Sequence, residues 1–468
     1  MGASMTLSGR LRGFDEGARE FDDQPLEVQG RLPDWLRGSL LLNGPACWAL
    51  PGGGLRHWFD GYAMLHRLHF GGGRPVYRSR WLQSHVFRQS RSSGRPAKGE
   101  FGSPNPLPWW RRLMRNDGTD NAAVTLTPHG SSWLAATETP FLWHIDPDTL
   151  DTRDAVLLNE GPGGVQAMSA HGATLADGSF LTVGTAFGRT HEQRLLLLKP
   201  GAQQAEVIAR VPMREVGYTH GFALAPGHAI LWECALRAKP LAMRFGGRAY
   251  CENFEWRPGG GSRLHAVPLD GGAVRSWDIP PMMTFHAAQA WAEGDTLVLD
   301  LAVYDDATVF DDLLLARRRA GAAMRSVPRL VRYRLEPGRA DAKPEPLGVV
   351  IELMQVHPKA VGARRASVCF GGGGFETGAF FDRTLRFDLE TGAVQAWQRG
   401  NAVQLEPIFV PRPGGSADDD GVLIINTLAD SDSTSQVFVL DARTLEPLAQ
   451  VAAPQVLPFG FHGAFSAG

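Results

Sequence analysis

Three histidines of this sequence begin segments of the same form. His171 opens HGATLADGSFLTV, His220 opens HGFALAPGHAILW, and His286 opens HAAQAWAEGDTLVL. In each segment a short apolar run, a glycine turn and a second apolar run follow, which is the pattern of a β-hairpin. A fourth histidine, His462, lies in LPFGFHGAF between glycines and aromatic residues. Equivalent positions of a repeat meet when the repeats surround an axis, so we predict that these four histidines form one cluster.

A cluster of neutral imidazoles suits a divalent first-row metal ion. Because the predicted ligands include no carboxylate or thiolate, we expect iron(II). Zinc is the competing ion, although zinc sites usually mix histidine with cysteine or carboxylate. The chain has 14 histidines, and a histidine considered alone is more often a core or surface residue than a ligand. From spacing alone, four ordinary histidines therefore remain an alternative.

The elements that must position these histidines are short strands. The chain contains 55 glycines and 32 prolines, and turn signals such as Asp177-Gly178 and Pro226-Gly227 separate short apolar or alternating runs. Only residues 306–325 and 107–116 have a helical pattern, as short insertions that cap one face. Repeated hairpins without a linker predict an all-β protein, a β-propeller formed by a single domain over residues 1–468, with residues 1–24 as an N-terminal extension. A sandwich or barrel is the alternative.

Composition excludes several classes of protein. Of the 468 residues, 43% are hydrophobic and 21% are charged, which is typical of a globular chain rather than a disordered one. The formal net charge of -2 gives no long-range reason to bind nucleic acid. The cysteines, Cys47, Cys234, Cys251 and Cys369, form no CxxC pair and are expected to be reduced core thiols. Because no apolar stretch is long enough for a signal peptide or a membrane span, we expect a cytoplasmic protein.

Eight blocks of the sequence occur in an order that is characteristic of one family. They are LNGPACW…HWFDGYAMLHRLHF (42–70), TDN…TET…DPDTLDT (119–152), SAHG (169–172), THGFAL (219–224), FHAAQAW (285–291), IELMQVHPKAVGARR (351–365), LEPIFVPRPGGSADDDGVLI (405–424) and GFHGAF (460–465). Together they resemble the carotenoid cleavage oxygenases, which include apocarotenoid oxygenases and retinoid-processing enzymes. The resemblance runs from about residue 25 to the last residues.

The resemblance implies a seven-bladed β-propeller that carries iron(II) on its central axis. The positions that match the family's ligand motifs are His171, His220, His286 and His462. The implied reaction is the oxidative cleavage of a carbon–carbon double bond of a carotenoid or apocarotenoid by dioxygen, which gives two carbonyl products. No protein acid or base is required, so we nominate no catalytic side chain beyond the metal centre.

The resemblance also implies glutamates that orient the metal ligands. The matching positions are Glu138 in TETP, Glu352 in IEL and Glu406 in LEP. A carboxylate that accepts the distal N–H of an imidazole fixes the orientation and tautomer of the ring and raises its basicity. Three glutamates leave one histidine without a carboxylate, and we expect this to be His171. Thr137, beside Glu138, is implied to crowd an open coordination position, unless it is a core threonine.

Residues 104–116, PNPLPWWRRLMRN, mix apolar and basic side chains. The apolar residues are Trp109, Trp110, Leu113 and Met114, and three arginines lie among them. This mixture is typical of a short interfacial helix that dips into lipid and keeps its arginines at the headgroups. The resemblance implies a membrane-contacting insertion at about this point, so we expect peripheral membrane contact. A loop that packs its tryptophans inward is the alternative.

Other functions remain open at this stage. A related activity is cleavage of a stilbene or phenylpropanoid alkene, which needs polar groups for a phenol, and the chain has only five lysines. A non-catalytic propeller that binds an apolar ligand is a further alternative, and an isomerohydrolase is a more distant one. The expected partners are dioxygen and an apolar polyene, with no obligate protein partner. Tyr62, Ala63 and Ala287 depart from the family pattern, which leaves the exact substrate open.

Overall fold

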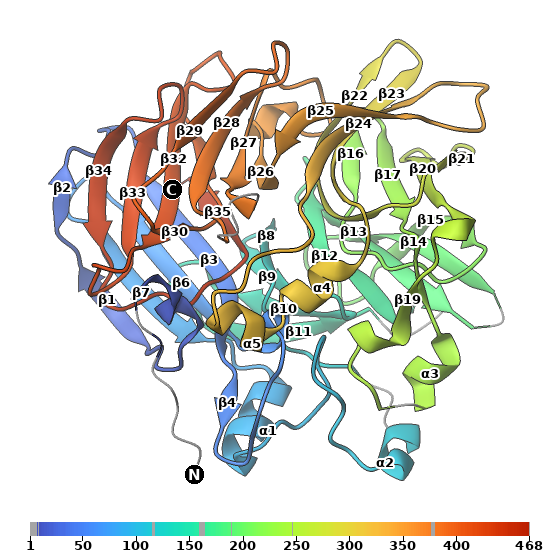
Figure 1. The fold of residues 1–468 in the computed structure, drawn as a ribbon, viewed down its shortest axis with the longest axis horizontal. Helices are drawn as coiled ribbons and strands as arrows, with labels where there is room; N and C mark the ends of the chain where they lie inside the picture. Colours follow the sequence, from blue (N-terminus) through green and yellow to red (C-terminus); the bar gives the residue numbers. More distant parts are fainter. Residues whose placement is uncertain are drawn as a thin grey trace.

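In the computed structural model, the described residues are 7, 9–114, 118–158, 164–188, 190–245, 247–375 and 380–467. Within them, seven sheets of four to six strands follow one another around a common centre, and the colours of Figure 1 run once around this ring. The protein is therefore a seven-bladed β-propeller, as the sequence predicted. The sheets are named blades 1 to 7 below.

Blades 1 to 4 are antiparallel, and each is given from the rim to the axis. Blade 1 is formed by β1 (Phe21–Pro25), β7 (Val76–Trp81), β6 (Tyr62–Phe70), β3 (Gly38–Cys47) and β35 (His462–Ser466). Blade 2 is formed by β11 (Thr152–Leu157), β10 (Phe141–Ile145), β9 (Ser132–Ala136) and β8 (Thr125–His129). Blade 3 is formed by β15 (Glu206–Met213), β14 (His191–Leu198), β13 (Phe180–Phe187) and β12 (Ala167–Thr174). Blade 4 is formed by β21 (Arg275–Ile279), β20 (Ser262–Pro268), β17 (His228–Glu233) and β16 (Ala223–Ala225).

Blades 5 to 7 complete the ring in the same way. Blade 5 is formed by β25 (Pro344–Val350), β24 (Arg329–Leu335), β23 (Thr296–Tyr304) and β22 (Met283–Glu293). Blade 6 is formed by β29 (Val394–Trp397), β28 (Arg383–Asp388), β27 (Val368–Gly373) and β26 (Glu352–Gln355). Blade 7 is formed by β2 (Val28–Gly30), β34 (Pro447–Ala452), β33 (Gln436–Asp441), β32 (Gly421–Leu428) and β30 (Val403–Gln404), and β31 (Ile408–Pro411) also pairs with β32.

Strands from opposite ends of the described chain close the ring twice. β2 pairs with β34 at the rim of blade 7, and β35 pairs with β3 near the axis of blade 1. The second pairing places Asn43 opposite His462, the first residue of β35. The last described strand therefore closes the ring and carries His462 toward the axis.

The inner strands are irregular where the predicted site residues lie. The pairing register shifts between Met168 and Gly172 in β12, and between Thr284 and Ala287 in β22. It shifts again in β26 between Glu352 and Gln355. Bulges of this kind bend a strand and redirect its side chains. They interrupt the in-and-out alternation at His171, at His286 and at Glu352.

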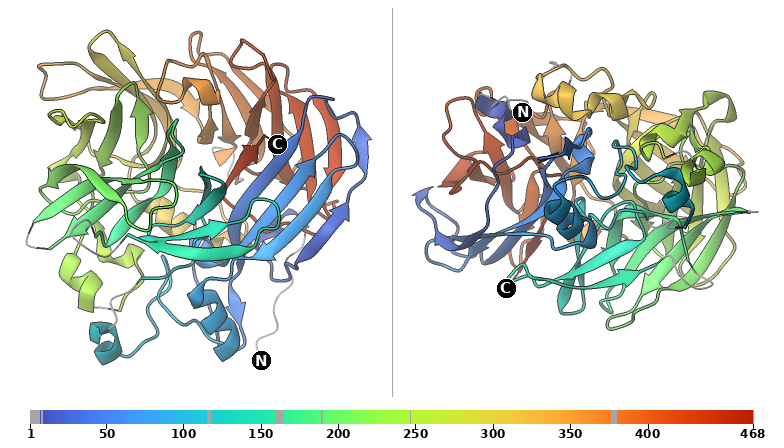
Figure 2. Two further views of the ribbon diagram at one scale, coloured as in Figure 1. Left: turned by 180° about the vertical axis from the view of Figure 1, so that it is seen from behind. Right: turned by 90° about the horizontal axis from the view of Figure 1, so that it is seen from below.

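Short helices cover one end of the propeller. α4 (Thr308–Asp312) and α5 (Leu315–Arg319) lie over the centre of the ring in Figure 1, beside η1 (Gly9–Phe14). α1 (His85–Ser93), α2 (Trp109–Met114) and α3 (Pro240–Phe245) lie together below the ring in that view, and α2 contacts α3. Figure 2 shows the same helices from two other sides. Among the described residues, no helix is long and apolar enough to cross a membrane.

The segment 306–325 differs from the single helix that its pattern suggested. The extended backbone of Leu314, with φ −56° and ψ 130°, separates α4 from α5. The Asp312 carboxylate accepts hydrogen bonds from the backbone N–H groups of Arg325 and Ser326, at 2.6 and 3.1 Å. The Asp312 carbonyl accepts another from Arg318 Nε at 2.6 Å. These contacts fold the segment back on itself, which a continuous helix does not allow.

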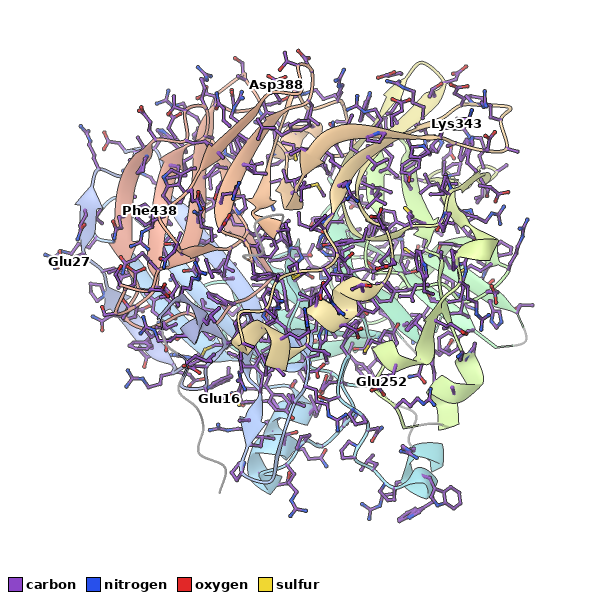
Figure 3. The ribbon with its side chains drawn as sticks, viewed as in Figure 1. Glu16, Glu27, Glu252, Lys343, Asp388 and Phe438 are labelled. Carbon is purple, nitrogen blue, oxygen red and sulfur yellow. The ribbon has the colours of Figure 1, made fainter. Side chains whose placement is uncertain are left out.

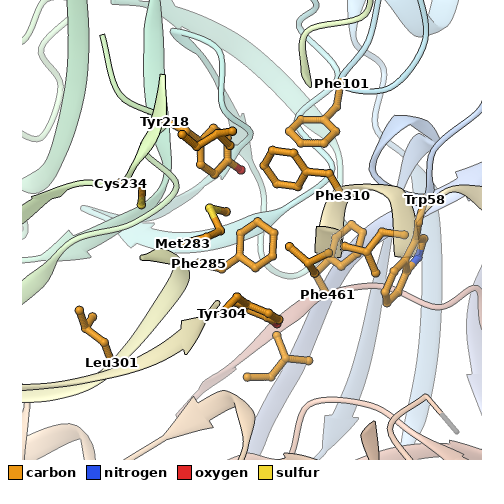
Figure 4. Packing of buried hydrophobic residues seen from close by; sticks show 14 of the residues in the cluster. Trp58, Phe101, Tyr218, Cys234, Met283, Phe285, Leu301, Tyr304, Phe310 and Phe461 are labelled. Atoms are coloured by element: carbon orange, nitrogen blue, oxygen red, sulfur yellow. The ribbon is translucent and has the colours of Figure 1, made fainter. Parts of the chain in front are cut away.

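The remaining elements are short connections between the strands of the blades. They are β4 (Ala49–Leu50), β5 (Gly53–Gly54), β18 (Leu236–Ala238), β19 (Phe254–Trp256), η2 (Trp58–Asp60), η3 (Cys251–Asn253), η4 (Pro258–Gly260) and η5 (Pro358–Ala360). The largest hydrophobic cluster lies between the inner strands and the helices of the covered end, and it is rich in aromatic rings such as Phe285 and Tyr304 (Figure 4). Side chains also fill the space between blades, whereas charged residues such as Glu27 and Lys343 are exposed at the periphery (Figure 3).

Candidate metal centre

Four inner segments bring the predicted histidines together. His171 lies on β12, His220 precedes β16, His286 lies on β22, and His462 opens β35. One ring nitrogen of each histidine lies within 4.8 Å of the corresponding nitrogens of the other three. The ring of His171 lies 5.0, 4.9 and 4.6 Å from the rings of the other three, centroid to centroid. The protein therefore has a four-histidine group that is able to bind a metal ion.

The arrangement of these ring nitrogens suits binding of a metal ion better than hydrogen bonding between the rings. Nitrogen ligands at about 2.1 Å from a metal ion lie at most about 4.2 Å apart, which is close to the spread of these nitrogens. Nε2 of His171 and Nε2 of His220 face each other at 3.3 Å. Nε2 of His286 is buried and has no hydrogen-bond partner among the described residues, and such groups are rare in native structures. A metal ion between the rings would satisfy these nitrogens together.

Three glutamates accept hydrogen bonds from the outer nitrogens of three histidines. Nδ1 of His220 lies 2.7 Å from Glu138 Oε1, and Nδ1 of His286 lies 2.6 Å from Glu352 Oε2. Nδ1 of His462 lies 3.1 Å from Glu406 Oε1. Each carboxylate holds Nδ1 as the protonated nitrogen, so Nε2 points inward with a free lone pair.

His171 differs from the other three histidines, in the way the sequence suggested. No carboxylate is described beside its ring, and its own backbone N–H donates to Ser169 Oγ at 3.0 Å. The Ser169 hydroxyl in turn donates to the carbonyl oxygens of His171 and His220. Ser169 therefore fixes the backbone of His171 and the carbonyl of His220, while no described carboxylate orients the His171 ring.

Burial keeps the imidazoles of His171 and His220 neutral. It holds the pKa of His171 and that of His220 well below the usual range, and the neighbouring histidines lower both further. Burial also raises the pKa of Glu138 to about 8, while the hydroxyl of Tyr218 opposes that rise. Neutral imidazole is the form that binds a metal ion.

Three further residues support the glutamates, and the sequence analysis did not find them. Tyr218 donates to Glu138 Oε1, and Tyr304 donates to Glu352 Oε1 at 3.2 Å. Gln355 Nε2 donates to Glu406 Oε1 at 3.0 Å. Tyr218 stands two residues before His220, and residues i and i+2 of an extended segment share a face. The spacing of Tyr218 and His220 could have predicted from the sequence that they lie on one face. Tyr304 is 48 residues from Glu352, so no local pattern predicts their contact.

Thr137, predicted to lie near an open coordination position, directly follows β9 and is half-buried. It precedes Glu138, so the same turn sets the position of both residues. The described residues that line the two cavities beside the histidines do not include it. Its role therefore stays a prediction.

Two cavities of different character meet at the histidines. A channel of about 380 Å³ with a mixed polar and apolar lining runs along the axis and is lined by His171, Thr127 and Gln289, among others. A smaller apolar cavity of about 50 Å³ lies on the covered side, and its lining includes Phe285, Tyr304 and further aromatic residues. Figure 4 shows several of these rings around Phe285. His286 and His462 line both cavities, so the cluster lies between them.

The tryptophans of α2 point outward. The side chain of Trp109 is 65% exposed and that of Trp110 is 45% exposed. The Arg111 guanidinium lies 4.9 Å from the Trp110 ring. The alternative in which this pair packs inward is therefore wrong. The side chains of Leu113 and Met114 lie outside the described part of the chain.

Comparisons with known proteins agree with this architecture. The family model described as "Retinal pigment epithelial membrane protein" matches residues 14–467. A carotenoid cleavage dioxygenase 8 homolog of Oryza sativa subsp. japonica is 30% identical over 497 residues, which cover 99% of this chain and 88% of that protein. A mitochondrial carotenoid-cleaving dioxygenase of Mustela putorius furo is 27% identical, over 94% of this chain and 93% of that protein.

Solved structures match over nearly the whole chain as well. The cobalt-substituted apocarotenoid oxygenase of Synechocystis superposes with a TM-score of 0.85 at 26% identity. The match covers 98% of both chains. Its metal-substituted form shows that this structural neighbour binds a metal ion.

Proposed function

The chain belongs to the carotenoid cleavage dioxygenase family, which the retinal pigment epithelial membrane protein model describes, and we propose that it is an iron(II) dioxygenase that cleaves a double bond of a carotenoid or apocarotenoid. The two products are carbonyl compounds, and each receives one oxygen atom of dioxygen. The proposed metal ligands are His171, His220, His286 and His462. The observation that carries the proposal is the cluster of these four imidazoles, three of which line an aromatic cavity.

The choice of iron(II) is supported by the ligand set. Four neutral nitrogens leave a divalent ion with its full charge and with open coordination positions. Iron(II) bound there would supply the activation of dioxygen. Zinc has no redox chemistry and most often takes four ligands in a closed tetrahedral site, which suits this reaction poorly.

The residues of the chain would hold the substrate and exclude water. Phe285 lies 4.9 Å from His220, ring to ring, and 5.7 Å from Tyr304. Such rings provide a dry wall against which one polyene double bond can lie beside the metal centre. Glu138, Glu352 and Glu406 would hold the ligand rings in place, and no side chain needs to transfer a proton.

The lining of the apolar cavity favours a polyene over a phenolic alkene. Its described residues include no lysine or arginine that could pair with a phenolate. Its polar groups, Tyr304 and Glu352, are bonded to each other, and Glu352 is also bonded to a proposed metal ligand. A phenol would therefore find few free partners there.

We also propose that Trp109 and Trp110 contact a membrane surface, from which an apolar substrate would reach the protein. Exposed tryptophans beside Arg111 form the arrangement that binds the interface between lipid tails and headgroups. The sharp contrast between these exposed rings and the buried aromatic residues of the core supports this role.

An aerobic assay of the iron(II)-loaded protein with a detergent-dispersed apocarotenal tests the proposed function. We expect the visible absorbance to fall and mass spectrometry to identify two carbonyl products. The His220→Ala variant is the control and should be inactive. If the protein with verified bound iron turns over no polyene, the proposal is wrong, and stilbenes and phenylpropenes are the next substrates to assay.

A further inference from the structure

A second chamber lies behind the apolar cavity, away from the axial channel. It has a volume of about 290 Å³ and lies between η1, the end of α5 and blade 7. Its lining mixes apolar and polar residues, among them Arg10, Phe14, Arg318, Ala322, Phe380 and Asn401. Ligand pockets usually have volumes from about 300 Å³ upward, so the chamber is large enough for one end of a ligand.

An aromatic wall lies between this chamber and the apolar cavity. Phe380 lines both the chamber and the apolar cavity that His220, His286 and His462 adjoin. The Phe380 ring lies 4.9 Å from the Trp58 ring, and the Trp58 ring lies 5.4 Å from the Phe14 ring. The two spaces are therefore neighbours on opposite sides of these rings.

The apolar cavity on the covered side of the histidines is too small to hold a long polyene by itself. Its volume of about 50 Å³ is far below that of a ligand pocket. A long polyene with one double bond at the metal centre must therefore extend beyond it. The chamber behind Phe380 is adjacent space of suitable size.

Arg318 gives the chamber a buried hydrogen-bond donor. The residue is only 2% exposed. Its Nε donates to the Asp312 carbonyl at 2.6 Å, and its Nη2 donates to the Ala322 carbonyl at 2.7 Å. Within the described residues, Nη1 has no hydrogen-bond partner, and the guanidinium carbon lies 5.3 Å from the Phe380 ring. Burial lowers the pKa of Arg318 to about 10, so the group remains protonated at neutral pH.

Three other polar groups of the chamber are bonded elsewhere. Arg10 Nη1 donates to the Asn401 carbonyl at 2.6 Å, and the Asn401 amide donates to Asp430. Asp382 accepts from Arg383 Nε at 2.8 Å. Arg318 lines the chamber, so its Nη1 is a donor that an oxygen atom of a ligand can meet there.

We propose that this chamber receives an oxygen-bearing end group of the polyene substrate and that Arg318 donates a hydrogen bond to that oxygen. The inference rests on the proposed function and narrows its substrate class. A hydroxyl, an aldehyde and a carboxylate share the acceptor oxygen that Arg318 requires. The protein would therefore prefer a polyene with such an end over a pure hydrocarbon.

Binding to the metal-free protein tests this preference without turnover. The ligands are polyenes of one length that end in a hydroxyl, an aldehyde, a carboxylate or a methyl group, and the readout is the shift of their visible absorption. We expect Arg318→Met to weaken binding of the oxygen-bearing ligands about 10-fold, since a hydrogen bond to a charged group is lost. Binding of the methyl-ended ligand should change less than 2-fold. The order among the three oxygen-bearing ligands identifies the end group.

Two further variants separate this role from a general effect on folding. Arg317→Met is the matched control, because Arg317 is the neighbour on α5 and is not among the described residues of the chamber. It should leave all affinities unchanged. Ala322→Leu keeps Arg318 and fills the chamber, so it should weaken every ligand of full length.

Three results would overturn the inference. One is an Arg318→Met variant that keeps the preference for oxygen-bearing ends, another is a variant that loses affinity equally for all ligands, and the third is unchanged binding to Ala322→Leu. If the wild-type protein binds these ligands and the iron(II)-loaded protein cleaves them, the proposed function stands whatever Arg318 does. If it neither binds nor cleaves any of them, both proposals fail.

Discussion

Nδ1 of His286 donates a hydrogen bond to Glu352 at 2.6 Å across the boundary between blades 5 and 6. The other two pairs also join different blades. Glu138 follows the third strand of blade 2 and bonds His220 before blade 4, while Glu406 of blade 7 bonds His462 of blade 1. The carboxylates therefore orient the proposed ligands and also connect the blades around the axis.

Glu352→Gln should weaken metal binding by about 10- to 100-fold, as expected for loss of a carboxylate behind a ligand histidine. Glu352 accepts from His286, from the Leu353 N–H at 2.7 Å and from Tyr304. A neutral amide cannot accept all three bonds. A chelator competition titration measures the change. Glu345→Gln on the half-exposed surface of β25 is the control, and an equal loss in both variants would contradict the prediction.

Tyr218→Phe should weaken metal binding about 10-fold and destabilise the protein by about 1–2 kcal/mol, since Glu138 loses a hydrogen bond. The absorption spectrum of the cobalt(II)-loaded variant should also shift, because the His220 ring is held less firmly. Tyr333→Phe is the matched control, since Tyr333 is buried and no hydrogen bond of its hydroxyl is described. A cobalt spectrum and an affinity that equal those of the wild type would exclude a positioning role for Tyr218.

Metal removal should lower the free energy of unfolding. A ligand present at 100 times its dissociation constant stabilises the native state by about 2.7 kcal/mol. We expect a rise in melting temperature on addition of iron(II) to the metal-free protein, and no rise for His286→Ala. His228→Ala, which changes a histidine in a hairpin turn outside the cluster, should respond like the wild type. A full response of the His286→Ala variant would place the metal elsewhere.

Asp60 should make stability depend on pH between 4 and 6. Burial raises the pKa of Asp60 to about 6, although the N–H of Gly102 and the hydroxyl of Ser103 favour its charged form. The folded state then binds the proton more tightly than the unfolded chain, so the stabilisation present at pH 4 is lost as the pH rises through 6.

The stability difference between wild type and Asp60→Asn measures this effect. The free energy of unfolding of the wild type, relative to that of Asp60→Asn, should fall by roughly 3 kcal/mol between pH 4 and pH 7. Denaturant unfolding at several pH values gives both free energies. Parallel stability curves for the two proteins would show that Asp60 does not titrate in this range.

Replacement of both Trp109 and Trp110 by alanine should lower vesicle binding roughly 10-fold or more, because two exposed aromatic surfaces are removed. Co-sedimentation with phosphatidylcholine vesicles measures the effect, and vesicles with an anionic lipid test the contribution of Arg111. Val394→Ala removes an exposed apolar side chain on β29 and serves as the control. Undiminished sedimentation of the double variant would reject the membrane proposal, while cleavage of dispersed substrate should be unaffected.

The propeller could be predicted because its hairpins leave local signals. The segments at His171, His220 and His286 each form the first hairpin of a blade, with turns at Gly178, Gly227 and Gly294. The glycines adopt the left-handed backbone that these turns require. Such signals lie within about twenty residues of each other and can be read without tertiary information.

Other features depend on contacts that a local pattern does not contain. The break between α4 and α5 follows from bonds of Asp312 with Arg318 and Arg325. The donation from Tyr304 to Glu352 connects two blades. The bulge in β26 also shifts Gln355 relative to Glu352, so strand alternation does not predict that Gln355 reaches Glu406.

The double closure of the ring sets the order of events during biosynthesis. His462 opens β35, so the set of four histidines is complete only after the strands of blades 2 to 7 have been synthesised. The sheet of blade 7 is also completed late, because its rim strand β2 is synthesised early and the partner strand β34 is synthesised late. Pairings of such high sequence separation are slow to form. A nascent chain that stalls before residue 462 therefore cannot hold the ion with all four histidines.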